Sequence, residues 1–457
     1  MKRLKKTFFV TACSILFFVH GINAQSTPIN FEASGTGATT TLATDYQSLG
    51  VNPANLGYPQ NGRMIHFSFL ETGFSLTSDA LTRKDIWQTF VSNNLNDFTL
   101  QDKKNAASLF GGAGFIMDAN INLASFSIQN KKLGGIGFVI RDRMSNQLKF
   151  NDKLAELIFW GKDASYFQNA QPVSLEQLFK DSRISGSWYR EFMLGYGRRL
   201  LKLPGIKLYV GADIKYILGY GNLNIYSDDK DGFFARSAIT PFAEVKYDVS
   251  SPTALSQSGL KPVGHGWGFD MGATARLLDV FKVGMAINDL GSITWDSETY
   301  EAPNIQVDSI SSSGFDSYQF LSEIKSLFLN NHILQWQGTG KYTTGLPAHL
   351  KLGASFNPAK WFEVGVDMYA PLNDHAANLD KAIYSAGGFF RIGNLTKISV
   401  GYVDGDIYED NVPVGLAFGI RNWEMGFATG DILTFFRQKQ PTLSIGTGFL
   451  RFKFGPA

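Results

Sequence analysis

The sequence has little cysteine, few histidines and almost no long apolar runs. Its single cysteine, Cys13, cannot form a disulfide within the chain. Its mean hydropathy of −0.07 is that of an ordinary soluble protein, whereas helical membrane proteins need about 20 apolar residues for each span. None of the six histidines lies two to four residues from another histidine or a cysteine. These absences argue against a disulfide scaffold, a helical membrane protein and a zinc site.

The one apolar run lies at the N-terminus and has the layout of a secretory signal. A basic stretch precedes an apolar core from Phe8 to Val19, and Ile22 to Ala24 form a plausible cleavage site. We therefore predict a signal peptide over residues 1–24. The alternative is a lipoprotein site at Val10 to Cys13, but apolar residues continue past the cysteine, which favours ordinary cleavage.

Cleavage after Ala24 would change both the charge and the chemistry of the chain. It would remove Cys13 and four basic residues, leaving 38 basic against 40 acidic residues, a net charge of −2. No basic excess then remains to indicate a nucleic-acid partner. The sequence also has no Gly-x-Ser-x-Gly motif and no P-loop. We predict neither an enzyme nor a cofactor.

Alternation of apolar and polar residues dominates the rest of the chain. From Ile206 to Leu218 every second residue is apolar, and the residues between them include Lys207, Asp213 and Lys215. This period of two separates two faces of a strand, whereas a helix would mix them. The same pattern recurs from Trp267 to Leu277. Such segments run to about 10–15 residues, which favours a membrane barrel over a soluble sandwich.

Turn lengths give the strand count. Short turns are expected near residues 130–132, 202–205, 278–280, 357–360, 393–394 and 421–422, and longer segments lie between them. Outer-membrane barrels keep short turns in the periplasm and long loops outside. All six turns fall on one side only if Ala238 to Val249 forms an extracellular hairpin instead of a wall strand. The sequence then predicts an all-β, antiparallel barrel of about fourteen strands over residues 63–457, in the outer membrane, with outer-membrane lipid as its partner.

Charged residues recur on the side of these strands that should face the lumen. Both signs occur, so an ion filter of one sign is not expected. Because a buried charge needs a partner, we expect a network that braces the barrel. Its predicted members are Arg141, Arg143, Arg199, Asp213, Lys215, Asp270, Arg276, Lys282, Glu363 and Asp367, with Lys351 and Arg391 in the same phase.

Residues 25–62 precede the first wall strand and contain the turn Asn52, Pro53, Ala54. An Asn-Pro-Ala turn at this place resembles the long-chain fatty-acid transporter family, including its type IX secretion shuttle barrels. Residues 266–272 and 287–295 are similar to an uncharacterised branch of those barrels. The resemblance implies fourteen strands, with residues 25–62 folded into the lumen as a plug, and it implies fold more strongly than substrate.

The long loops contain apolar residues at helical spacing. One set follows Thr82, a second follows Ser317, and Ser174 begins a possible capping box for a third helix. Such helices above the barrel mouth would either collect apolar molecules or pack on one another and close the top. The residues predicted to form this loop cluster are Ile86, Trp87, Phe90, Phe320, Leu321 and Ile324.

Two functions follow from these features. The first is a transporter-like channel for hydrophobic small molecules, suggested by the plug and the apolar loops. The second is a scaffold or accessory barrel of a secretion or surface-assembly complex, suggested by the large loops and the filled lumen, with secretion or surface proteins as partners. Acidic residues from Asp404 to Asp410 are expected to form a solvated loop, with a divalent-ion site as the alternative.

Overall fold

The computed structural model describes residues 31–58, 64–86, 98–165, 172–229, 232–245, 247, 249–255, 259–307, 312–317, 323, 325–329, 333–375, 378, 381–393, 395–405, 408–439 and 441–455. The signal peptide expected over residues 1–24 lies outside them and stays a prediction. Among the described residues, no helix combines the length and apolar character that crossing a bilayer requires.

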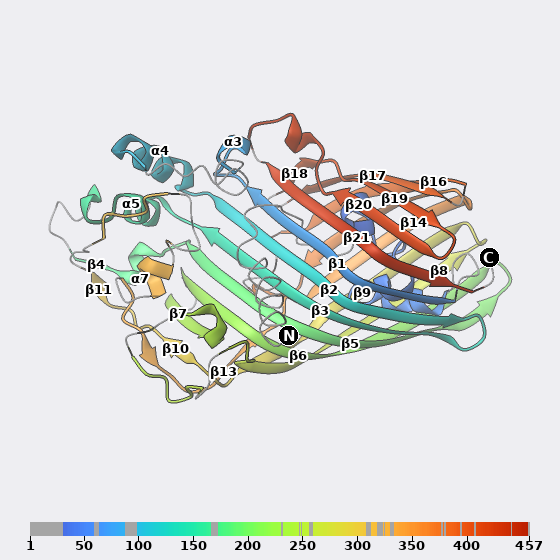
Figure 1. Ribbon diagram of the computed structural model, residues 1–457, viewed down its shortest axis with the longest axis horizontal. Helices are drawn as coiled ribbons and strands as arrows, with labels where there is room; N and C mark the ends of the chain where they lie inside the picture. Colours follow the sequence, from blue (N-terminus) through green and yellow to red (C-terminus); the bar gives the residue numbers. More distant parts are fainter. Residues whose placement is uncertain are drawn as a thin grey trace, which may run out of the picture.

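Fourteen antiparallel strands of the described chain form a closed wall, which confirms the predicted fold and strand count (Figure 1). Each strand pairs with the next, and β1 closes the ring by pairing with β21 from Ile65↔Phe454 to Thr77↔Thr442. The wall strands are β1 (Ile65–Ser78), β2 (Gly114–Asn130), β3 (Gly134–Lys149), β5 (Arg183–Leu203), β6 (Ile206–Asp228), β8 (Gly264–Leu277), β9 (Phe281–Trp295), β14 (His349–Ala359), β15 (Phe362–Pro371), β16 (Ile383–Ile392), β17 (Thr396–Gly405), β19 (Val414–Ile420), β20 (Trp423–Thr429) and β21 (Thr442–Phe454).

The two ends of the barrel differ, as the turn lengths predicted. Short turns join β2 to β3, β5 to β6, β8 to β9, β14 to β15, β16 to β17 and β19 to β20. The first and last wall strands also begin and end at this end, which we name the turn end. The opposite, loop end has the long connections and the small strands β4 (Val173–Ser174), β10 (Thr299–Glu301), β11 (Gln306–Val307), β12 (Gln337–Gly338), β13 (Tyr342–Gly345) and β18 (Tyr408–Asn411).

The described residues between Ala238 and Val249 are outside the wall, as the parity argument required. The strand of this segment is placed differently from the prediction: β7 spans Gly232–Ile239 and pairs with the far end of β6 from Gly221↔Ile239 to Asp228↔Gly232. A short 3-10 helix, η5 (Pro241–Ala243), then ends the extended chain. The pairing extends β6 to 23 residues, well beyond the expected 10–15. β19 and β20 are shorter than expected, at seven residues each.

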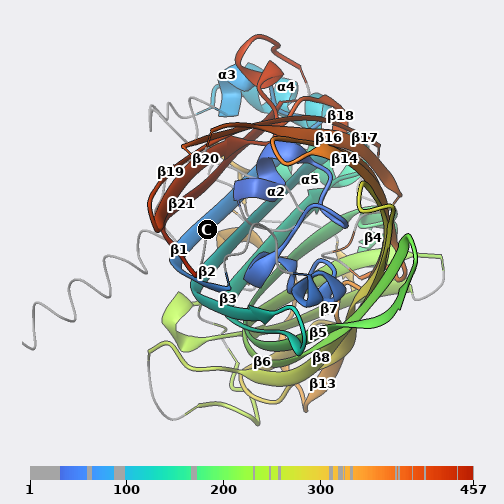
Figure 2. The same ribbon diagram turned by 90° about the vertical axis from the view of Figure 1, so that its right-hand side faces the viewer.

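Residues 31–58 lie inside the barrel, and we name them the plug. They contain helix α2 (Phe31–Thr36) and the 3-10 helices η1 (Asp45–Ser48) and η2 (Pro53–Gly57). A view from the turn end shows these elements within the ring of strands (Figure 2). The plug backbone lies directly against glycines of the wall. A Cβ on Gly211 would overlap the carbonyl of Pro53, and one on Gly387 or Gly401 would overlap that of Thr36. The wall therefore needs glycine where the plug backbone touches it.

Short helices cover the loop end (Figure 1). The predicted capping residue Ser174 accepts from the amide of Gln177 at 3.2 Å and begins α7. A capping box at Thr99 begins α4, which the sequence analysis missed, as it missed α5. The elements are α3 (Arg83–Ile86), α4 (Leu100–Phe110), α5 (Asp152–Trp160), α7 (Leu175–Leu178), the 3-10 helices η4 (Gly161–Asp163) and η7 (Leu433–Phe435), and the π-helix η6 (Lys325–Leu329).

The contact between the plug and Gly211 gives a first prediction. We expect Gly211→Val to lower the free energy of unfolding by about 1–3 kcal/mol, because its side chain overlaps the Pro53 carbonyl and forces backbone shifts. Urea unfolding of the purified barrel measures this change. Gly340→Val is the control, since a Cβ there meets no atom within 4 Å. Equal stability of the two variants would contradict the docking contact.

Candidate functional site

The Asn-Pro-Ala turn is fixed to the lumen wall. The Asn52 side chain accepts from the Ala54 amide at 3.2 Å and begins η2, with Pro53 at its first position. Its amide nitrogen donates to the Thr40 carbonyl at 3.1 Å and to the Thr274 hydroxyl of β8 at 3.0 Å. Asn55 accepts from the same hydroxyl at 2.8 Å. The turn therefore joins two parts of the plug to one strand of the wall.

Charged wall residues also bind the plug backbone. Asp213 accepts from the Gly50 amide at 3.1 Å, and Asp367 accepts from the amides of two consecutive plug residues, Thr39 and Thr40. Lys282 donates to the Thr41 carbonyl at 3.0 Å and pairs with Glu363 at 2.6 Å. Hydrogen bonds between charged side chains and backbone groups are stronger than neutral ones. These predicted lumen residues thus hold the plug.

A second set of contacts fixes the start of the plug near the turn end. Arg451 of β21 is almost fully buried and pairs with Glu71 at 2.8 Å, with Glu424 at 2.5 Å and with Glu32 of α2 at 3.2 Å. It also donates to the Tyr46 hydroxyl at 2.9 Å. One guanidinium therefore joins three wall strands to two elements of the plug.

A network of charges crosses the lumen above the plug. Arg141 pairs with Glu191 at 2.6 Å, and Arg143 pairs with Glu191 at 3.3 Å and with Asp289 at 2.8 Å. Lys215 contacts Asp289 and pairs with Asp270 at 2.8 Å. Arg143 lies on β3 and Asp289 on β9, with three wall strands between them, so this pair connects distant parts of the ring. The network braces the barrel across its interior.

Only some of the charged residues that the sequence predicted to form one network in the lumen contact one another. Arg141, Arg143, Lys215 and Asp270 belong to the network across the lumen, whereas Asp213, Lys282, Glu363 and Asp367 lie against the plug. Arg276 lies near the turn end, where it pairs with Asp279 at 3.4 Å and lies over the Tyr58 ring at 4.4 Å. Arg199 is exposed at the same end and has no ion pair with a described residue.

The sequence analysis missed several members of these networks, and Glu191, Arg451 and Asp289 illustrate two reasons. Glu191 and Arg451 are in phase with inward-facing neighbours, so the period of two could have identified them. Asp289 could not be found in this way. A β-bulge places Asn288 and Asp289 opposite the single residue Asp270, with φ of +59° at Asp289, so both residues turn inward.

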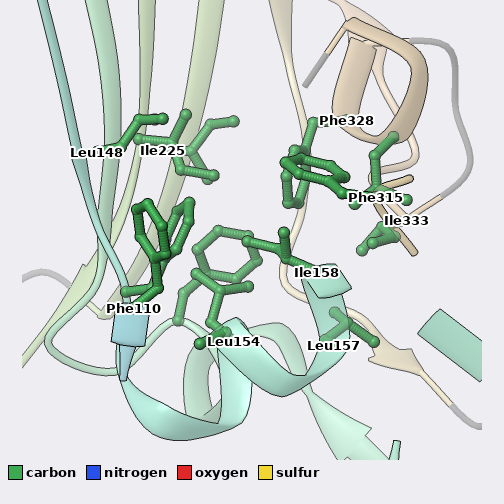
Figure 3. Close-up of a cluster of buried hydrophobic side chains, with 14 of the residues drawn as sticks. Phe110, Leu148, Leu154, Leu157, Ile158, Ile225, Phe315, Phe328 and Ile333 are labelled. Carbon is green, nitrogen blue, oxygen red and sulfur yellow. The ribbon is translucent and has the colours of Figure 1, made fainter. Parts of the chain in front are cut away.

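An apolar cluster closes the loop end, and we name it the cap. Phe110 of α4, Leu154 and Ile158 of α5, Phe328 of η6 and Leu148 of β3 converge in it (Figure 3). Of the six loop residues predicted to cluster, Ile86 belongs to the cap and is buried. Trp87, Phe90, Phe320, Leu321 and Ile324 lie outside the described residues.

The cap continues to the outer face of the wall at Leu443. This residue of β21 pairs with the buried Leu76 and packs against the cap. It also lines an outer groove of about 450 Å³ beside Leu416, Phe427 and Phe435. The groove lies beside the place where the pairing of β20 with β21 stops, at Ala428↔Gly446.

A larger depression, of about 890 Å³, lies elsewhere on the wall, with outward-facing residues such as Leu352 and Val366 in its lining. It follows a row of directly paired residues across successive strands, in which Ala275, Ala354 and Ala386 alternate with larger side chains. The small side chains account for the hollow. No group of three or more histidine, cysteine, aspartate or glutamate residues that could hold a metal ion occurs in the described part of the chain.

Comparisons with known proteins give one family and several distant structures. The model of a family described as "Family of unknown function (DUF5723)" matches residues 59–429. No curated protein matches the chain. The Pseudomonas putida toluene transporter TodX is similar at 10% identity and a TM-score of 0.48, over 94% of this chain and 99% of that one.

Two further solved structures show comparable similarity. The Ralstonia pickettii toluene transporter TbuX has 13% identity and a TM-score of 0.44, over 96% of this chain and all of that one. A Pseudomonas aeruginosa FadL homologue has 10% identity and a TM-score of 0.43, over 95% and 99% of the two chains. The matches thus include the transporter family that the sequence resembles. At these values they carry no conclusion about substrate.

The lumen network gives the second prediction. We expect Arg143→Met to lower the free energy of unfolding by about 3–5 kcal/mol, because it leaves the buried Asp289 and Glu191 without a shared partner. Arg199→Met is the matched control and should change stability by less than about 0.5 kcal/mol, since that residue is exposed. Urea titration of both barrels in lipid vesicles measures the difference. A similar loss in both would mean that the network does not brace the wall.

Proposed function

We propose that this chain, which belongs to the family of unknown function DUF5723, is an outer-membrane barrel that passes small apolar molecules from its loop end into the surrounding bilayer. The observation that carries the proposal is the continuity at Leu443, which belongs both to the edge of the apolar cap and to the groove on the outer wall. Residues 1–24 would export the chain, residues 25–62 would contain the plug, and residues 63–457 would form the barrel.

The outer face of the wall supports a membrane location. Every wall strand exposes a large apolar side chain there, a surface that a protein in water rarely presents. One such residue from each strand, in ring order of the chain, is Phe69, Phe126, Phe138, Leu194, Ile214, Trp267, Val283, Leu352, Val366, Phe390, Val400, Leu416, Phe427 and Leu450. With the short turns in the periplasm, the cap would face the cell exterior.

The lumen itself is a poor route for an apolar molecule. Below the cap it contains buried ion pairs of Arg141, Arg143 and Lys215. An apolar molecule placed there would separate charges and polar groups from their partners at a high cost in free energy. The plug then fills the turn end. A sideways route from the cap past Leu443 avoids both obstacles and ends in a medium that an apolar molecule prefers.

A scaffold or accessory barrel is the second candidate. The scaffold is favoured by the lumen, which is braced by charges and filled by residues 31–58. Such an interior suits a rigid support as well as a transporter. Only a channel requires the connection at Leu443. Filling the groove therefore separates the two candidates.

The third prediction tests the route. Leu443→Trp should lower the initial rate of radiolabelled toluene uptake by about tenfold or more. The larger side chain would fill the groove, and a barrier to passage raised by about 1.4 kcal/mol slows a rate tenfold. Toluene is the solute of two of the matched channels. Gram-negative cells producing each variant provide the measurement, with an immunoblot of outer membranes to equalise the amount of barrel.

Leu352→Trp is the matched control, because Leu352 faces outward in the other depression, away from the cap. It should leave uptake unchanged. If cells that lack the protein take up toluene as fast as cells that contain it, the channel proposal fails and the scaffold is favoured.

A further inference from the structure

Basic residues are concentrated around the turn end, which faces the viewer in Figure 2. A lysine or arginine lies within, or within two residues of, each of the six short turns. One from each turn, in chain order, is Lys132, Lys202, Arg276, Lys360, Arg391 and Arg421. Most of them are exposed, as are Lys131 and Arg199 close by. The turn end therefore has a ring of cations, which we name the basic ring.

Acidic residues are scarce at the same end. Of the six turns, only the one between β8 and β9 contains an acidic residue, Asp279, whose carboxylate already pairs with Lys207 at 2.6 Å and with Arg276 at 3.4 Å. Glu424 of β20, also near this end, pairs with Lys453 at 2.6 Å. A chain cleaved after residue 24 would have 38 basic and 40 acidic residues, so the positive charge of the turn end is local and not a property of the whole protein.

Exposed apolar side chains lie among these cations. Leu133 and Leu278, each within a turn, are both 72% exposed. Exposed aromatic rings lie at or next to the turns: the Tyr196 hydroxyl donates to the Leu133 carbonyl at 2.6 Å, and the Trp361 ring lies 5.1 Å from that of Phe390. Aromatic girdles of membrane barrels lie at the boundary between hydrocarbon and headgroups. The basic ring would therefore lie at the depth of the headgroups of one leaflet.

From this arrangement we propose that the basic ring binds anionic phospholipids of the surrounding leaflet, with its cations paired to lipid phosphates and the exposed leucines in contact with acyl chains. Basic residues beside a membrane attract anionic lipids, and the attraction increases with the number of cations. The leucines favour a lipid surface over an acidic protein, because they gain most from contact with hydrocarbon. Such contacts would anchor the turn end at a fixed depth in the bilayer. The proposal rests on the membrane location proposed above and is independent of the route past Leu443.

Electron paramagnetic resonance of spin-labelled lipids tests this preference. The purified barrel is reconstituted in phosphatidylcholine vesicles that contain a trace of either spin-labelled phosphatidylglycerol or spin-labelled phosphatidylcholine, and the spectra give the fraction of each probe that the protein immobilises. We expect phosphatidylglycerol to be favoured about twofold or more, as an average over all lipids that contact the barrel. Salt at about 1 M should abolish the preference, because it shortens the range of the attraction to about 3 Å.

Two matched variants locate the preference. One replaces four exposed lysines of the turn end (Lys131→Gln, Lys132→Gln, Lys202→Gln and Lys360→Gln) and should immobilise both probes equally. The other removes the same charge from four exposed lysines of the loop end (Lys104→Gln, Lys153→Gln, Lys162→Gln and Lys180→Gln) and should keep the preference. Substitutions at such surface positions change stability little.

Equal immobilisation of the two probes by the unmodified barrel overturns the proposal and favours an acidic protein as the partner of the basic ring. A preference that survives the turn-end substitutions also overturns it, and so does an equal loss in both variants, because net charge alone would then account for the effect. These outcomes leave the membrane location intact. That location would be contradicted only if the barrel immobilised neither probe.

Discussion

A closed wall of fourteen strands encloses more space than its own side chains can fill, since about eight strands already leave an interior just wide enough for them. The chain fills this space with the backbone of residues 31–58 and with ion pairs that cross it. Both the plug and the ion pairs restrict which residues the wall strands can contain. Glycine is required where the plug backbone touches a strand, as at Gly211 and Gly387. Charged residues of opposite sign are required where Arg143 on β3 reaches Asp289 on β9.

The wall could be predicted from the sequence because it depends on local patterns. Alternation identified the strands, and short turns set their parity, so that the segment after Ala238 could be excluded. The contacts inside the barrel were harder to predict, because the residues that form them lie far apart in the chain. Arg451 and Glu32 are 419 residues apart, and the bulge at Asp289 reverses the phase that alternation assigns. The sequence offered no sign that wall glycines such as Gly401 are contact positions for the plug.

The helices of the loop end were harder to predict from the sequence than the wall strands. These helices are short and gain stability from packing on one another, so their periodicity is a weak signal. Thr99 begins α4 with a capping box, yet α4 buries only Ala106 and Phe110. By contrast, α5 buries five apolar residues. The apolar residues expected after Thr82 pointed to the right place, since Ile86 is in the cap, but not to the helices that supply most of it.

The plug and the cap close the barrel with interactions of different kinds, and this difference determines which closure can yield to an apolar molecule. Opening the plug end would expose the backbone bonds of Asp213 and Asp367 and the pair of Arg451 with Glu32 together, because all of these contacts hold the same segment, residues 31–58. Cap side chains such as Leu154 and Phe328 contribute non-directional apolar contacts, which an entering apolar molecule can replace with its own. A small apolar solute therefore loses little free energy when it displaces part of the cap. It gains nothing by displacing the plug, so in the proposed channel the contacts that hold the turn end closed would also direct such a solute sideways, toward Leu443.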